Sequence, residues 1–172
     1  MSTVRITLYI SFLPVLMLLC GFFWTTPNWE NINSTLDRKY ASVTHINTDD
    51  LRTLVQRGNQ TILIDVREAD EYAVSHLPGA VNILSPVEVN YPTDTSIVLY
   101  CSVGIRSAKF ARDLENRGFT RVMNLRGSIF EWANKGYRLM RGDKDVQEVH
   151  PFNKRWSKLL KPSLHRYYPP TP

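Results

Sequence analysis

Hydrophobic residues in the middle of the chain are grouped in short β-branched runs, and amphipathic segments separate these runs. Two of them, 61–66 (TILIDV) and 96–100 (SIVLY), are apolar almost throughout rather than at alternate positions. A continuous apolar run of this length is typical of a strand that is buried on both faces of a parallel sheet. We therefore predict that these two segments form the centre of a sheet.

Three shorter apolar segments, 44–46, 80–83 and 121–125, predict further strands. The amphipathic segments predict helices at 48–57, 69–75, 106–117 and 128–136. We expect Thr48 to cap the first helix, and Ser128 to open the last one in a capping box with Glu131. Strands that alternate with helices predict an α/β fold, an open and mostly parallel five-stranded sheet with helices on both faces.

The N-terminal part has a different pattern. Residues 6–24, from Ile6 to Trp24, form a 19-residue run without a charged side chain. At about 1.5 Å per residue such a helix is roughly 28 Å long, close to the thickness of a bilayer's hydrocarbon core. A cleaved signal peptide is the alternative, but its apolar part is shorter, and a small-residue cleavage site is missing after Trp24.

We therefore predict a single-pass transmembrane anchor over 1–24, followed by a polar linker over 25–42. The short tail before the anchor favours a body outside the cytoplasm, which is the periplasm in a bacterium.

The basic charge is confined to one end of the chain. The 21 basic and 16 acidic residues give a net charge of +5, but residues 1–149 hold 16 of each, and 150–172 hold five basic residues and no acidic one. A neutral body argues against a nucleic-acid partner. In the basic segment a short helix would place four apolar residues on one face: Phe152, Trp156, Leu159 and Leu160. This face either lies on anionic lipid or packs against the domain.

Composition narrows the class of protein further. The hydrophobic fraction of 43% is too high for a disordered chain. Two cysteines, Cys20 and Cys101, are too few for a disulfide scaffold or a cysteine-rich zinc site, so we expect no metal. Cys20 lies in the apolar N-terminal run, where it is expected to pack like a small apolar residue.

Cys101 follows directly after the second continuous apolar strand, at the sheet edge where ligands of α/β proteins bind. The next residues contain a glycine and lead into a helix, so backbone N–H groups can turn inward and stabilise a thiolate. Cysteines placed in this way have a pKa of about 3.5–7.5, against about 8.5 for a free thiol. We predict that Cys101 is a nucleophile and that the loop binds an anionic substrate through Ser102, Val103, Gly104, Ile105, Arg106 and Ser107. A buried, inert cysteine is the alternative.

Four blocks of the sequence resemble single-domain rhodaneses, a family of sulfurtransferases. They are ILIDVRE (62–68), SHLPGAVNI (75–83), IVLYCSVGIRS (97–107) and NLRGSIFEWANKGYRL (124–139). Where family members often have a Gly-Gly pair, this chain has Gly127-Ser128. The resemblance implies a rhodanese-like domain over 43–140 and leaves 141–172 as a basic, aromatic extension.

The resemblance also implies a mechanism without a cofactor. Cys101 would take sulfur from a small anionic donor such as thiosulfate, and the persulfide would pass it to cyanide or a thiol. Arg106 would favour the anionic donor; its alternative role is a surface ion pair. Asp65 and Arg67 match positions that brace the site through an ion pair, and His76 is expected to pack or cap a turn.

Two other functions remain open. Related phosphatases and arsenate reductases have a Cys-x5-Arg loop, whereas Cys101 and Arg106 form the shorter Cys-x4-Arg, which suits a bound sulfur atom better. A membrane-tethered binding module without turnover is the second alternative, and the presence of Cys101 argues against it.

Overall fold

The computed structural model describes residues 26–58 and 60–168. Its main sheet has five parallel strands in the order β1-β5-β4-β2-β3. The strands are β1 (Thr44–Ile46), β2 (Ile62–Asp65), β3 (Val81–Asn82), β4 (Ile97–Tyr100) and β5 (Val122–Leu125). This arrangement confirms the predicted parallel sheet.

β4 is the central strand of this order, and all four of its residues are buried. It pairs with β2 on one side and with β5 on the other, so that Tyr100 lies beside Asp65 and Leu99 lies beside Asn124. This register brings Cys101, the residue after β4, to the carboxyl edge of the sheet. The two continuous apolar runs are therefore the two strands that position the candidate nucleophile.

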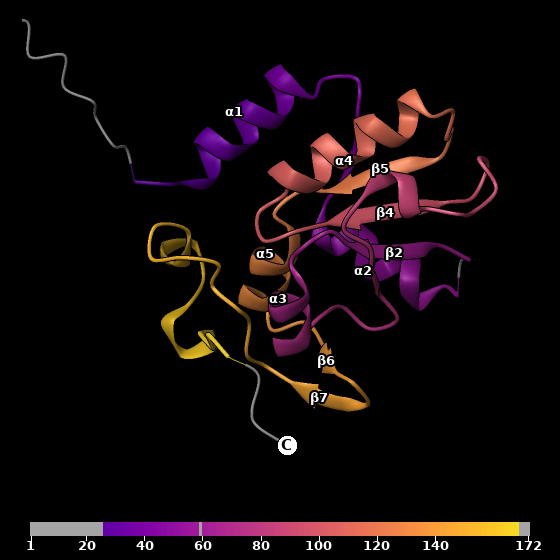
Figure 1. Ribbon diagram of the computed structural model, residues 1–172. Coiled ribbons are helices and arrows are strands. Elements are labelled where there is room, and N and C mark those ends of the chain that lie inside the picture. Colours follow the sequence, from indigo (N-terminus) through magenta and orange to yellow (C-terminus); the bar gives the residue numbers. More distant parts are fainter. Residues whose placement is uncertain (1–25, 59, 169–172) are drawn as a thin grey trace, which may run out of the picture.

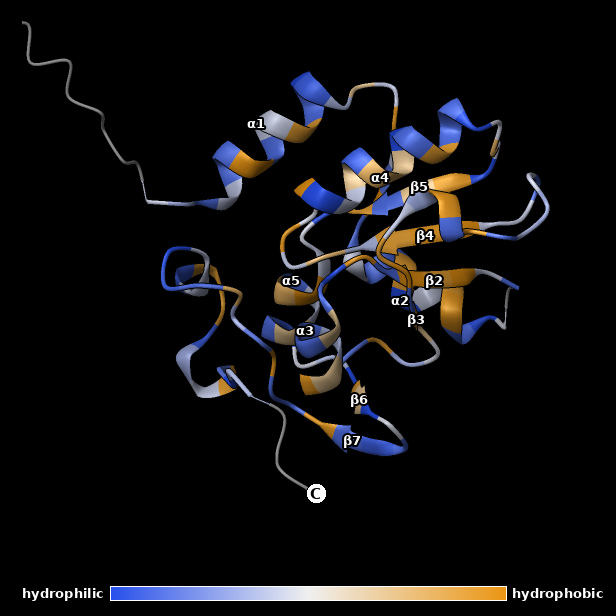
Figure 2. Ribbon diagram, viewed as in Figure 1, coloured by the Kyte–Doolittle hydropathy of each residue, from blue (hydrophilic) through white to orange (hydrophobic). Residues whose placement is uncertain are grey.

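In the part of the chain that the structure describes, five α-helices surround the sheet: α1 (Trp29–Lys39), α2 (Thr48–Gln56), α3 (Ala69–Val74), α4 (Ile105–Asn116) and α5 (Ser128–Asn134). α4 covers one face and α1 packs outside it, whereas α2 and α5 contact each other on the other face (Figure 1). In Figure 2 the inner strands β2 and β4 are coloured hydrophobic, whereas the helices around them carry both hydrophobic and hydrophilic residues, which is the pattern of a core between two helical layers.

The expected linker over 25–42 is wrong in one respect, because it contains α1. Asn28 caps this helix by accepting a 2.8 Å hydrogen bond from the N–H of Asn31. Trp29, Ile32 and Leu36 lie on one helical face, and the latter two are buried. The helix is polar on its remaining faces, so its sequence signals are weak: a narrow apolar stripe and the capping residue Asn28.

Two predicted caps are also wrong. Asn47 caps α2 in place of Thr48, which is fully buried and accepts a hydrogen bond from Lys135 Nζ at 2.8 Å. Gly127 is the N-cap of α5, and no side-chain capping bond is present there. Ser128 is instead buried under the Cys101 loop.

A hairpin that the sequence did not indicate follows the domain. Its strands, β6 (Leu139–Arg141) and β7 (Lys144–Val146), are antiparallel. His76 and Met140 exchange both backbone hydrogen bonds, at 2.9 and 2.8 Å, and so join the hairpin to the turn after α3.

The basic extension docks on the domain. In place of one amphipathic helix it forms two 3₁₀ turns, Trp156–Leu159 and Pro162–Leu164. Leu159 and Leu160 are buried, and Asn134 at the end of α5 donates to Leu159 O at 2.7 Å. The sequence left two interpretations of this segment, contact with anionic lipid and packing against the domain, and in the structure the segment packs against the domain.

The predicted anchor over 1–24 lies outside the described residues. Within 26–58 and 60–168, no helix combines the length and the apolar character needed to cross a bilayer.

Candidate active site

The Cys101 thiol lies inside a loop that connects β4 to α4. The backbone N–H of Gly104 points at Cys101 Sγ from 3.2 Å, and the Ser107 hydroxyl lies 3.6 Å from the same sulfur. Gly104 has a φ of +106°, and a Cβ there would stand 3.2 Å from Leu125 O. Glycine is needed at this position because other residues rarely adopt this backbone conformation.

The electrostatics of the loop favour a thiolate. Burial raises the pKa of the Cys101 thiol, whereas the positive charge of Arg106 and hydrogen bonds from Ser107 and Gly104 lower it. The lowering contributions prevail, so the pKa of Cys101 lies below the ordinary value of a cysteine. A thiolate is the nucleophilic form of this side chain.

Arg106 is beside the site and also in an ion pair. Its Nη2 lies 3.0 Å from both carboxylate oxygens of Glu71 and 3.1 Å from the Ser102 hydroxyl. Glu71 is buried, with 3% of its side chain exposed. Sequence reasoning missed Glu71, since 35 residues separate it from Arg106 and no motif marks it.

The first residues of α5 are hydrogen-bonded to the backbone of the Cys101 loop. Ser128 Oγ accepts a 3.1 Å hydrogen bond from the Cys101 N–H and donates one of 2.9 Å to Leu125 O. The backbone N–H groups of Ile129 and Phe130 donate to the carbonyls of Cys101 and Ser102. Ser128 thus fixes the nucleophile's backbone rather than capping the helix.

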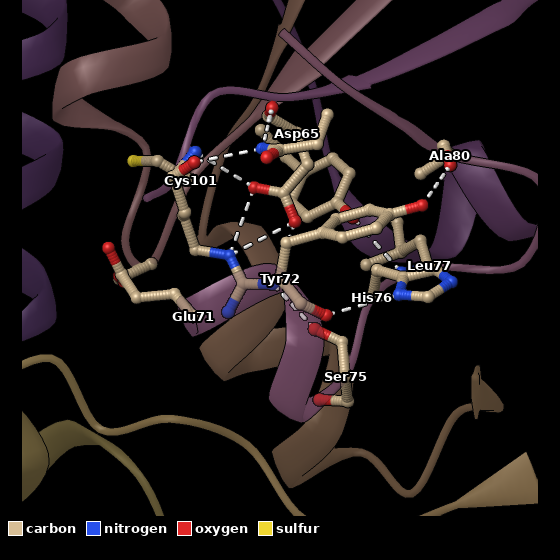
Figure 3. A network of polar contacts seen from close by, with 12 residues as sticks. Asp65, Glu71, Tyr72, Ser75, His76, Leu77, Ala80 and Cys101 are labelled. Atoms are coloured by element: carbon tan, nitrogen blue, oxygen red, sulfur yellow. Dashed lines mark hydrogen bonds and ion pairs between the residues drawn. The ribbon is translucent and has the colours of Figure 1, made fainter. Parts of the chain in front are cut away.

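Asp65, which Figure 3 labels in the polar network beside Cys101, forms a buried ion pair with Arg67. Arg67 Nη2 lies 2.7 Å from Asp65 Oδ2 and 2.6 Å from Ser75 O, and both side chains are fully buried. Burial alone would lower the pKa of Arg67, but the Asp65 carboxylate outweighs burial and raises this pKa, so the guanidinium stays charged. The pair holds the turn after β2 to the end of α3.

Comparison with known proteins agrees with this geometry. A family model described as rhodanese-like domain matches residues 47–135, more than half of the chain. The chain belongs to the rhodanese-like domain family. The match spans β2, α3, the Cys101 loop and α5, which are the elements that build the site.

Individual relatives of this rhodanese-like protein are known. A sulfurtransferase of Allochromatium vinosum is 36% identical over 98 residues, which are 53% of this chain and 92% of the relative. The thiosulfate:glutathione sulfurtransferase of Saccharomyces cerevisiae is 23% identical over 134 residues, 67% of this chain and 92% of the relative.

The crystal structure of thiosulfate sulfurtransferase from Pseudomonas aeruginosa has a TM-score of 0.57 at 17% identity. The likeness covers 76% of this chain and 26% of that one, and it shows the shared fold.

A cavity of about 140 Å³ opens onto Cys101 in the rhodanese-like domain. Val103 and Ile105 of the predicted loop line it together with Phe152 and Trp156 of the extension. The phenyl ring of Phe152 also lies against the Arg106 guanidinium, 4.7 Å from ring centre to Cζ. Sequence reasoning named both aromatic residues as part of an apolar face, but nothing in the sequence placed them beside Cys101.

His76 packs in the turn, as expected. Its ring stacks on Tyr72 with centroids 4.0 Å apart, and its Nδ1 lies 3.2 Å from Tyr72 O (Figure 3). Burial lowers the pKa of His76. Among the described residues, no group of three or more His, Cys, Asp and Glu side chains could hold a metal ion.

Proposed function

We propose that this chain is a rhodanese-type sulfurtransferase that carries a sulfane sulfur on Cys101 as a persulfide. The observation that carries the proposal is the arrangement around Cys101 Sγ, where the Gly104 N–H and the Ser107 hydroxyl point at the sulfur and Arg106 lowers its pKa. Relatives named as sulfurtransferases support sulfur transfer in general.

In the first half-reaction the Cys101 thiolate attacks the outer sulfur of thiosulfate. A new S–S bond forms on Sγ, the S–S bond of thiosulfate breaks, and sulfite leaves with the electron pair. Backbone N–H groups and the start of α4 stabilise the anionic persulfide. In the second half-reaction cyanide or a thiolate attacks the outer sulfur, and the Cys101 thiolate is the leaving group.

The same arrangement disfavours the phosphatase alternative. Phosphate binding needs donors that face outward to several oxygens, whereas the Gly104 N–H is directed at Sγ itself. Arg106 Nη2 is already bonded to the Glu71 carboxylate and to Ser102. A tetrahedral anion would therefore have to compete with the Glu71 carboxylate for Arg106 Nη2.

A turnover assay of the full-length chain tests the proposal. With thiosulfate as donor, wild type is expected to produce thiocyanate from cyanide and a persulfide from glutathione. Cys101→Ser should lose both activities, and Cys20→Ser is the matched control that should keep them. If wild type instead hydrolyses an aryl phosphate, the phosphatase alternative is correct. If it neither transfers sulfur nor hydrolyses the phosphate, the protein is a binding module without turnover.

We also propose that residues 6–24 anchor the protein in a membrane, with the domain outside the cytoplasm. The full-length chain should then stay with the membrane fraction after carbonate extraction, and a protease added outside should digest the domain. Release by carbonate would contradict the anchor. We do not extend the proposal to lipid contact by the basic extension, because Leu159 and Leu160 are buried in the domain.

A further inference from the structure

The cavity beside Cys101 has an apolar outer wall. Its lining contains Val103, Ile105, Phe152 and Trp156 in addition to Cys101, Ser102 and Arg106. The two polar side chains of this lining are already engaged, since the Ser102 hydroxyl donates to Glu71 Oε1 at 3.1 Å and Arg106 pairs with the same carboxylate. The cavity therefore offers an apolar surface to whatever group reaches the sulfur.

Phe152 is held in this wall against its backbone preference. Its φ is +63°, in the left-handed region that residues other than glycine rarely adopt. The residues on either side of Phe152 are joined by a hydrogen bond of 2.8 Å from the Asn153 N–H to Pro151 O. The Phe152 N–H donates to His150 Nδ1 at 3.2 Å. Because the side chain is 39% exposed, burial in the core does not explain the strain. Strain of this kind is kept where it serves a site.

Trp156 is fixed by its neighbours as well. Asn153 Oδ1 accepts hydrogen bonds from the backbone N–H groups of Arg155 and Trp156, at 3.0 and 3.1 Å. Trp156 also lines a second hollow together with Ile32 of α1 and Ile105. Trp156 thus borders both the cavity and the hollow beside α1, and Asn153 holds its backbone in place.

We propose that this cavity is a specificity subsite, and that the chain takes organic sulfane-sulfur donors with an apolar group in preference to inorganic thiosulfate. The proposal rests on the sulfur transfer proposed above and names its substrate class. An apolar cavity of about 150 Å³ inside a protein holds a benzene molecule, so this cavity of about 140 Å³ has room for one aromatic ring.

The reaction with such a donor balances as it does with thiosulfate. The Cys101 thiolate attacks the terminal sulfur of an aryl thiosulfonate, forming the Cys101 persulfide. The S–S bond of the donor breaks, and the aryl sulfinate leaves with the electron pair. The aryl group lies in the cavity against Phe152 and Trp156 while this bond breaks, so that these two residues determine specificity and Cys101 is the nucleophile.

The test compares kcat/KM of the full-length chain for benzenethiosulfonate, methanethiosulfonate and thiosulfate, with cyanide as the acceptor. The measured quantity is the ratio of kcat/KM for the phenyl donor to that for the methyl donor, compared between wild type and variants. This comparison cancels the intrinsic reactivity of the two donors. Phe152→Ala and Trp156→Ala should each lower the ratio by about tenfold, since one apolar contact is worth that much discrimination.

Tyr168→Ala is the matched control, because Tyr168 is an aromatic residue of the same extension that is 80% exposed and lies outside the cavity lining. It should leave the ratio unchanged. Phe152→Leu keeps an apolar side chain without the ring and should lower the ratio by less than Phe152→Ala; if the alanine variant does not fold, the leucine variant decides.

A ratio that neither cavity variant lowers would overturn the subsite. Failure of the proposed function has a different signature, namely wild type that transfers sulfur from none of the three donors.

Discussion

The loop over 101–107 forms the inner wall of the site, and the extension after residue 150 forms its outer wall. The inner wall is one continuous segment whose backbone and side chains bond directly to Cys101 Sγ. The outer wall comes from residues about 50 positions later and contacts the site through aromatic rings. This difference suggests a division of labour, in which the inner wall activates the sulfur and the outer wall selects the group that delivers it.

The two walls also differ in how they are stabilised. A fully buried ion pair, Asp65–Arg67, and the Ser128 hydroxyl hold the elements around the inner wall. The outer wall is held mainly by Leu159 and Leu160, which are buried, and by hydrogen bonds to Asn134. Substitutions in each set of contacts test whether the walls are independent.

The largest effect is expected at Asp65. Asp65→Ala leaves the Arg67 guanidinium buried without its carboxylate, so the free energy of unfolding should fall by about 3–5 kcal/mol. The matched control is Asp145→Ala, since Asp145 pairs with Arg138 on the hairpin with both side chains more than 60% exposed. Its loss should be below about 1 kcal/mol. Denaturant unfolding measures both, and equal losses would contradict the assigned role of the buried pair.

The second largest loss of stability is expected at Leu160, in the outer wall. Leu160 is 2% exposed, and Leu160→Ala should lower the free energy of unfolding by about 2–4 kcal/mol, as for other buried leucines. Leu84→Ala, at a leucine that is 48% exposed, is the control and should have a much smaller effect. A Leu160→Ala variant as stable as wild type would mean that the extension does not hold the outer wall in place.

The inner wall could be predicted because its signals are local. The continuous apolar runs predicted β2 and β4, and the register of these strands brings Cys101 to the carboxyl edge of the sheet. The glycine at position 104 and the helix after it predicted a loop that encloses the sulfur. All of this is contained in a short stretch of sequence, so it needs no knowledge of the tertiary packing.

Contacts between residues that are far apart in the sequence could not be predicted, in either wall. Glu71 meets Arg106 across 35 positions, and Phe152 meets Arg106 through the path of an irregular segment. The periodicity of the extension predicts a helix with one apolar face, but Leu159 ends a 3₁₀ turn and Leu160 follows it in an extended conformation, and both are buried. The local sequence predicts Ser128 as a helix cap, because its true partner, the Cys101 N–H, is 27 residues away and no local pattern indicates that contact.

A smaller effect is expected at Ser128. Ser128→Ala removes the acceptor of the buried Cys101 N–H, so the free energy of unfolding should fall by about 1–3 kcal/mol and persulfide formation should slow. Ser163→Ala, at an exposed serine of the extension, serves as the control in the same unfolding and rate measurements. A Ser128→Ala variant that keeps wild-type stability and rate would show that the hydroxyl does not position the loop.

The smallest effect is a shift in pH dependence. Because the thiolate reacts, kcat/KM for thiosulfate should rise with pH as Cys101 loses its proton, and the lowered pKa places this rise below that of a free thiol. Arg106→Gln removes a charge that lowers the pKa of Cys101 and should move the rise to higher pH. One pKa unit corresponds to about tenfold in rate on the acidic side.

Arg106→Lys keeps the charge and is the matched control for that pH profile, so its rise should stay close to that of wild type. Superimposable profiles for wild type and Arg106→Gln would contradict the electrostatic role of Arg106.

The mass of the intact full-length chain tests the central claim most directly. After reduction, incubation with thiosulfate and removal of the donor, wild type and Cys20→Ser should each gain about 32 Da, one sulfur atom, and glutathione should remove it. Cys101→Ser should gain nothing. Two results would contradict the account. In one, wild type gains sulfur neither from thiosulfate nor from an organic thiosulfonate; in the other, Cys101→Ser gains as much sulfur as wild type.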